Sequence, residues 1–217
     1  MLVRFAAITA IAICVSSSAL AQDLKNEDDG HFAAKLMLGF GGEAEVEVDD
    51  IAGFEFDAGG QTDMEMTYGV GLSYMHPLHE YFALGGQLAL LSWTTDGLED
   101  TDADRSSMID LSLVPQLKYA VMDNLELYAS LPLGLTFGFF GEDEILTLDV
   151  GGGFGFNAAL MLGARVALSD GFGLLGELGY AYHAVTYPVE EQLSGADADL
   201  DISMGQLALN LGVWFQL

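Results

Sequence analysis

Apolar and polar residues alternate with a period of two along most of the chain. Between Leu125 and Phe139 every odd position is apolar, while the even positions carry glycine, proline, Tyr128 or a polar residue. The segment from Leu207 to Leu217 repeats this pattern. Because successive side chains of a β-strand point to opposite faces, both segments predict strands with one apolar face and one small or polar face.

Eight segments follow this pattern, and each can supply the roughly 9 to 11 residues that a tilted transmembrane strand needs. Their connections alternate between three tight turns (76–80, 121–124 and 169–172) and four long loops (43–63, 94–107, 140–149 and 188–200). Short turns at one end and long loops at the other predict an all-β fold, an eight-stranded antiparallel up-and-down transmembrane β-barrel. The segments are 32–42, 64–75, 81–93, 108–120, 125–139, 151–168, 173–187 and 201–217.

The faces of the paired segments also predict the turn geometry. Outward positions are even in segments two and three, odd in four and five, and even in six and seven, so each tight loop needs an odd number of residues. Asp123-Asn124 and Asp170-Gly171 supply residues that tolerate left-handed geometry. Pro115 and Pro132 fall within predicted strands, where we expect a bulge or a lost hydrogen bond at each.

Charge is sorted with the same topology. The chain has 33 Asp and Glu against 6 Lys and Arg, and 22 of the acids lie in or at the edges of the long loops. Hydrophobic residues make up 51% of the chain, which excludes an acidic disordered protein, and the acidic exterior argues against nucleic acid as a partner. The acidic and basic residues of the predicted strands all have inward parity, and we expect a lumen charge cluster of Lys35, Glu65, Asp110, Lys118, Glu126, Arg165, Glu177 and His183.

Within this cluster, charged residues flank two of the tight turns. Lys118 and Glu126 lie on either side of one turn, and Arg165 and Glu177 on either side of the next. We expect each couple to pair across its hairpin near the periplasmic end. Ion pairs that merely neutralise a polar lumen are the favoured interpretation, and a gate is the alternative.

The first 21 residues have the features of a signal peptide. Arg4 precedes an apolar run, and Ala19-Leu20-Ala21 is a small-x-small cleavage triplet. We expect residues 1–21 to be removed during export and residues 22–217 to form the outer-membrane barrel domain. Cys14 is the only cysteine, so the mature chain would hold neither a disulfide nor a cysteine-bound metal.

Strand number, loop asymmetry and the terminal segment together resemble the small eight-stranded outer-membrane barrels of the OmpA and OmpX type. In that family the last strand carries an assembly signal of alternate apolar residues with an aromatic at the end, which the barrel-assembly machinery reads. The resemblance implies a Gram-negative outer membrane, its lipids and that machinery as partners, and no periplasmic domain because the chain stops at Leu217. The matching positions are Leu209, Leu211, Val213, Phe215 and Leu217.

Two loops carry aspartate at alternate positions, as calcium loops of the EF-hand kind begin. Arg105 and Ile202 occupy the glycine position of that motif, and Leu111 and Ala208 its glutamate position. Solvated acidic loops are therefore the favoured interpretation, with weak Ca²⁺ or Mg²⁺ binding as the alternative and no other cofactor expected. The aspartates are Asp100, Asp102, Asp104, Asp197, Asp199 and Asp201.

No complete catalytic motif is present in the sequence. His183 is the only histidine in the upper half of a strand and has no adjacent serine, so we expect no enzymatic activity. The favoured function is a structural or surface-interaction role through acidic extracellular loops, with a narrow channel for ions or small solutes as the alternative. A secreted lipocalin-like barrel is the alternative from another class, but it would need the apolar face inside.

Overall fold

The computed structural model describes residues 29–48, 60–64, 66–93, 106–139, 144–145, 148–191 and 197–216. The predicted signal peptide, Cys14, Glu65 and the aspartates 100, 102 and 104 lie outside these residues. Among the described residues no helix is long and apolar enough to cross a membrane.

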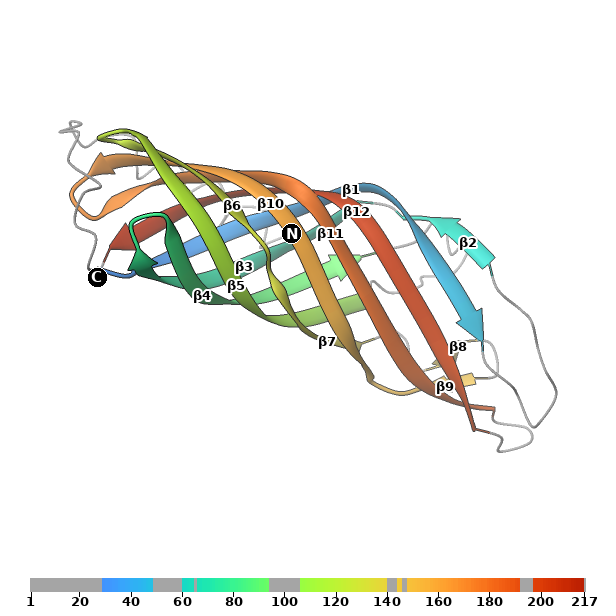
Figure 1. The fold of residues 1–217 in the computed structure, drawn as a ribbon. Coiled ribbons are helices and arrows are strands. Elements are labelled where there is room, and N and C mark those ends of the chain that lie inside the picture. Colours follow the sequence, from blue (N-terminus) through green and yellow to red (C-terminus); the bar gives the residue numbers. More distant parts are fainter. Residues whose placement is uncertain are drawn as a thin grey trace, which may run out of the picture.

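Eight antiparallel strands close into a ring (Figure 1). Each strand pairs with the next along the chain, and β1 closes the ring by pairing with β12 from His31 opposite Gln216 to Val48 opposite Leu200. This is the predicted all-β barrel, with the fifth strand divided into β6 and β7. The ring consists of β1 (His31–Val48), β3 (Thr67–His79), β4 (Phe82–Trp93), β5 (Ser106–Met122), β6 (Leu125–Ser130) with β7 (Leu133–Phe139), β10 (Gly153–Ser169), β11 (Phe172–Glu191) and β12 (Asp197–Gln216).

Strands β3 and β10 begin later than predicted, at Thr67 and Gly153, whereas β1, β5, β11 and β12 extend further toward the long-loop end than the sequence predicted. Three short strands add to the sheet there: β2 (Gly60–Asp63), β8 (Glu144–Ile145) and β9 (Leu148–Val150). The placement of Asp197 and Asp199 in a loop was wrong, because both belong to β12 and pair with β11. Extended backbone holds alternate residues on one face about 7 Å apart and does not wrap them around a cation.

Each tight connection is a two-residue turn next to a register shift. The turns are Glu80–Tyr81, Asp123–Asn124 and Asp170–Gly171, and the shifts fall between Pro77 and His79, Ala120 and Met122, and Ala167 and Ser169. One extra residue in each hairpin produces the equal parity that the sequence predicted. Gly171 has a φ of 69°, as expected for the left-handed position.

The two prolines explain why β6 and β7 are separate. Leu131 N–H donates to the Pro115 carbonyl at 3.0 Å, and Ala159 N–H donates to the Pro132 carbonyl at 2.9 Å. Proline has no N–H, so neither proline can donate a hydrogen bond back to the residue opposite it. The lost hydrogen bonds that the sequence predicted therefore fall at two consecutive residues of the fifth strand, Leu131 and Pro132. No bulge forms, because β5 keeps the same register with β6 and with β7.

The wall separates the two predicted faces. Apolar side chains such as Val70, Leu111 and Leu162 point outward and are 56%, 56% and 65% exposed. Inward positions are buried and hold most of the polar side chains of the strands. A continuous apolar exterior is the opposite of the arrangement that a water-soluble lipocalin-like barrel requires.

Candidate functional site: the barrel lumen

An apolar cluster fills the lumen toward the long-loop end. Met108, Tyr187 and Met204 are its largest fully enclosed members, at most 1% exposed. Met can fill irregular gaps in a narrow space because its side chain is unbranched and flexible. The cluster consists of Ala44, Met64, Ala89, Leu91, Trp93, Met108, Val185, Tyr187, Val189, Ile202 and Met204.

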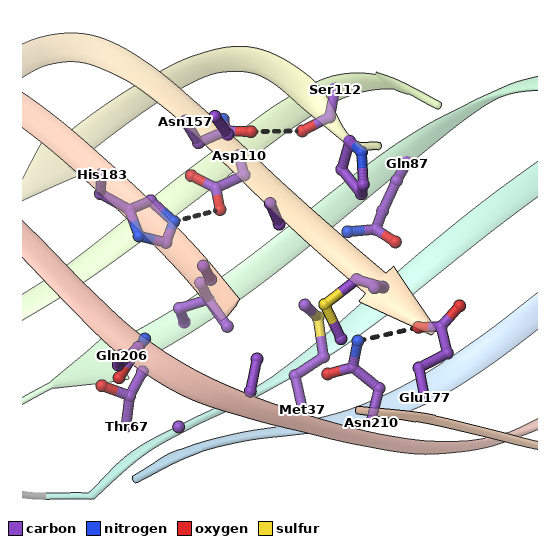
Figure 2. Close-up of a pocket in the computed structure, with 18 of the residues that line it drawn as sticks. Met37, Thr67, Gln87, Asp110, Ser112, Asn157, Glu177, His183, Gln206 and Asn210 are labelled. Atoms are coloured by element: carbon purple, nitrogen blue, oxygen red, sulfur yellow. Dashed lines mark hydrogen bonds and ion pairs between the residues drawn. The ribbon is translucent and has the colours of Figure 1, made fainter. Parts of the chain in front are cut away.

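A hydrogen-bonded polar group occupies the middle of the lumen. Nε2 of His183 lies 2.9 Å from Oδ2 of Asp110, and the hydroxyl of Thr136 donates to Oδ1 of Asp110 at 2.7 Å. Asn157 donates to the Thr136 hydroxyl, and Ser112 donates to Asn157 at 2.7 Å. The carboxylate of Asp110 is therefore satisfied on both oxygens, and it orients the imidazole of His183 (Figure 2).

A buried ion pair crosses the lumen nearer the tight-turn end. Nζ of Lys35 lies 2.9 and 3.0 Å from the two carboxylate oxygens of Glu177 and 3.1 Å from Oε1 of Gln87. Glu177 also accepts hydrogen bonds from Tyr128 at 3.0 Å and from Asn210 at 2.8 Å. Burying a charged group is costly unless the group is paired and hydrogen-bonded. Both carboxylate oxygens of Glu177 have such partners, and these partners offset the cost of burying its charge.

A second ion pair lies closer still to the tight turns. The guanidinium of Arg165 pairs with Glu126 and also contacts the imidazole of His31. Its central carbon lies 5.5 Å from the centroid of the Trp214 ring, a cation–π distance. The two ion pairs and the aromatic rings of Tyr128 and Trp214 form what we call the charged layer of the lumen.

The pairing predicted across the hairpins was wrong. Glu126 pairs with Arg165 rather than Lys118, and Glu177 pairs with Lys35 rather than Arg165. Arg165 lies directly opposite Glu126 across the β6–β10 interface, whereas Lys118 lies opposite Tyr128 and is only diagonal to Glu126. Directly opposite residues are closer than diagonal ones. Glu126 therefore pairs with Arg165, on the strand that follows a long loop, and not with Lys118 of its own hairpin.

The remaining predicted residues are placed as follows. Lys118 is half-buried beside the charged layer, and among the described residues it makes no ion pair. Asp199 is exposed and Asp201 accepts a hydrogen bond from Thr186, and the part of the chain that the structure describes contains no metal-binding group of three His, Cys, Asp or Glu side chains. Leu209, Leu211, Val213 and Phe215 all face outward on β12, whereas Leu217 lies outside the described residues.

Several uncharged polar residues of the lumen were not singled out from the sequence. Thr67, Gln87, Asn157 and Asn210 are buried and line the lumen beside the charged residues. All four lie at inward positions of their strands, so parity could have identified them. Gln87 contacts Lys35 of β1, Asn157 contacts β5 and β7, and Asn210 contacts Glu177 of β11, and parity alone does not give these partners.

A chamber of about 50 Å³, counted as space for the centres of water molecules, lies between the apolar cluster and the charged layer. Side chains from all eight strands surround it, including Met37, Asp110, Glu177, His183 and Gln206 (Figure 2). One water centre needs about 10 to 15 Å³, so the chamber has room for only a few non-hydrogen atoms.

Comparison with known proteins identifies the fold. No family model matches the chain, and no curated protein matches its sequence. The outer membrane protein OprG from Pseudomonas aeruginosa is similar in structure, with a TM-score of 0.66 at 12% identity over 92% of this chain and 99% of OprG. Outer membrane protein AlkL is also similar, with a TM-score of 0.55 at 14% identity over 93% of this chain and 94% of AlkL.

The chain therefore has the fold of small outer-membrane barrels, and its apolar exterior is that of a protein embedded in a bilayer. A more distant match, the outer membrane protease OmpT from Escherichia coli, has a TM-score of 0.46 at 8% identity over 88% of this chain and 98% of OmpT. The absence of enzymatic activity stays a prediction.

Proposed function

We propose that this outer-membrane barrel is a non-conducting surface protein that acts through the acidic loops at its long-loop end. The observation that supports this function is the filling of the lumen by two separate layers, the apolar cluster and the charged layer. An open pore would need a continuous polar path, and the enclosed side chains of Met108, Tyr187 and Met204 interrupt one.

We also propose how the protein reaches the outer membrane. Export would depend on the signal peptide at residues 1–21, and assembly on the alternate apolar residues from Leu209 to Leu217. Both expectations come from the sequence pattern and the family resemblance. Outer-membrane lipids would contact the apolar exterior, and the surface partner would meet the acidic loops.

A narrow channel is the second candidate function, and the central chamber favours it. The chamber is lined by Asp110, His183 and several amides, which are polar groups of the kind that line solute pathways. Conduction would require the apolar cluster and the charged layer to open together. The buried Lys35–Glu177 pair and its hydrogen bonds oppose that opening.

Single-channel recording of the refolded protein in a planar bilayer tests the two candidates. We expect no steady conductance from protein whose folding is verified by heat-modifiable gel migration, because side chains cross the lumen at two levels. Glu177→Gln is the informative variant, since it removes the charge that holds Lys35. Discrete and reproducible openings of the unmodified protein would contradict the non-conducting role and establish the channel.

A further inference from the structure

A groove on the outer wall of the barrel lies where the apolar exterior meets the acidic long-loop end. It is formed by β1, β2, β11 and β12, which pair side by side there (Figure 1). Its volume is about 510 Å³, counted in the same way as the chamber of about 50 Å³. We call it the outer groove, and its lining includes Phe40, Glu43, Glu45, Asp63, Tyr180 and Leu207.

A β-bulge in β1 brings acidic side chains to this outer face. The register with β12 shifts between Phe40 and Gly42, and the extra residue is Gly41, with a φ of 54°. Before the bulge the even positions face outward, as Phe40 does, and after it the odd positions Glu43 and Glu45 do. A Cβ at Gly41 would meet nothing within 4 Å, so the bulge borders open space.

Neighbouring rows of outward residues give the outer groove an apolar half and an acidic half. Leu207 lies opposite both Phe40 and Tyr180, and the three side chains are 58%, 40% and 52% exposed. They form the apolar half. The acidic half follows directly above the bulge and consists of Glu43, Glu45 and Asp63. Such a change from apolar and aromatic to charged residues is expected where a barrel leaves the hydrocarbon layer and enters the headgroup region.

The acidic half has no positive partner among the described residues. Glu43 lies directly opposite Asp63, both are exposed, and like charges in this position destabilise a sheet. Every Lys and Arg that the structure describes faces the lumen, and none lines the outer groove. The described residues also contain no group of three His, Cys, Asp or Glu placed to hold a metal ion. An organic cation therefore fits the acidic half better than a metal ion does.

We propose that the outer groove binds one lipid of the outer leaflet whose headgroup carries a primary ammonium group. The apolar exterior around the groove contacts lipid, so a lipid is the occupant that continues this surface. The ammonium group donates to the carboxylates of the acidic half beside the ring of Tyr182, and the acyl chains lie on the apolar half. This binding site goes beyond the proposed surface role, and it does not depend on whether the barrel conducts.

Native mass spectrometry of the refolded barrel, released from detergent, measures which lipids stay bound. The probes share two myristoyl chains: phosphatidylethanolamine has a primary ammonium group, phosphatidylcholine a quaternary one and phosphatidylglycerol none. We expect one phosphatidylethanolamine to bind about tenfold more tightly than phosphatidylglycerol, the effect of one hydrogen bond to a charged group. Phosphatidylcholine should lie between them, because it keeps the positive charge but has no N–H. Equal binding of all three would show contact through the chains alone and overturn the proposal.

Matched variants locate the binding site. Glu43→Gln and Asp63→Asn each remove one carboxylate, and each should weaken phosphatidylethanolamine binding about twofold to fivefold, the range for an exposed ion pair. Asp199→Asn is the control, because Asp199 is exposed at the same end of β12 but does not line the outer groove. Equal weakening by the control would show a general attraction to the acidic end and overturn the proposal.

Reversing the charge provides a test that loss of folding cannot imitate. Glu43→Lys combined with Asp63→Lys should switch the preference to phosphatidylglycerol, whereas Asp199→Lys should keep the preference for phosphatidylethanolamine. Heat-modifiable migration verifies folding of every variant. An unchanged preference in the folded double variant would mean that the acidic half does not select the headgroup, and the proposal would then be wrong.

The role of divalent cations is tested by measuring every lipid in EDTA and again in magnesium chloride. We expect phosphatidylethanolamine to bind in EDTA, because its own ammonium group meets the carboxylates. Binding that requires Mg²⁺ and favours phosphatidylglycerol would show that the carboxylates act through a metal ion shared with lipid phosphate. That result would overturn the proposal.

Discussion

At the residue scale, Glu126 has two bases within reach and pairs with one of them. Arg165 lies directly opposite it across the β6–β10 interface, and its guanidinium also contacts His31 and Trp214. Lys118 approaches Glu126 only on the diagonal and stays half-buried. The planar guanidinium can contact a carboxylate and two rings at once, which an ammonium group does less well.

Replacing each base by an apolar residue should separate their contributions. Arg165→Met leaves Glu126 buried without its partner and should destabilise the barrel by about 3 to 5 kcal/mol. Lys118→Met removes a base that makes no ion pair among the described residues, and it should change stability by less than about 1 kcal/mol. Urea unfolding in lipid vesicles measures both. Equal destabilisation would mean that Lys118 and Arg165 share the carboxylate.

At the element scale, a glycine in one strand lets side chains of its two neighbours meet. Gly163 of β10 lies opposite Tyr128 of β6 and opposite Glu177 of β11. The Tyr128 ring packs over the glycine, and its hydroxyl reaches Glu177 two strands away at 3.0 Å. The absence of a side chain at position 163 is therefore what connects the charged layer across three strands.

Gly163→Ala tests this packing. A Cβ at position 163 would overlap the Tyr128 ring and displace the hydroxyl from Glu177, so we expect a loss of about 1 to 3 kcal/mol in stability. Gly86→Ala is the matched control on another strand, because its Cβ would meet nothing closer than the Ser112 carbonyl oxygen at 3.8 Å. Equilibrium unfolding in detergent or vesicles gives both values. An unchanged Gly163→Ala barrel would show that Tyr128 is not held by this contact.

At the scale of the whole molecule, the wall separates two environments. Large apolar side chains cover the outside, and most polar and charged side chains of the strands are buried inside, where Lys35, Arg165 and His183 each have an acidic partner. This distribution is stable only if the outside meets lipid, since exposed apolar patches of this extent are rare on water-soluble monomers. The loss of stability caused by a charge on the outer face therefore shows whether that face contacts lipid.

Leu162→Arg and Leu78→Arg compare two exposed leucines at different depths. Leu162 lies in the middle of β10 and is 65% exposed, while Leu78 lies beside a tight turn and is 57% exposed. Arginine near the bilayer midplane costs about 2 to 4 kcal/mol, but only about 0 to 1 near the interface. Unfolding from vesicles should therefore show a larger loss for Leu162→Arg. Equal losses would contradict the assignment of β10 as membrane-spanning.

The sequence by itself determined the strand number, the alternation of tight turns with long loops, and which face of each strand is apolar. These features are local, because the period of two follows from backbone geometry and tight turns fix the parity of their hairpins. The outward row of Val70 and Leu72 and the bulged turns could be predicted in this way.

Only the tertiary structure decided how the lumen is filled. Arg165 pairs with Glu126 through the β6–β10 register, and Lys35 reaches Glu177 although 142 residues separate them in the chain. Strand pairing across long connections sets these neighbours, and the alternation of residues within a strand carries no information about it. The central chamber exists for the same reason, since side chains from all eight strands enclose it once the ring has closed.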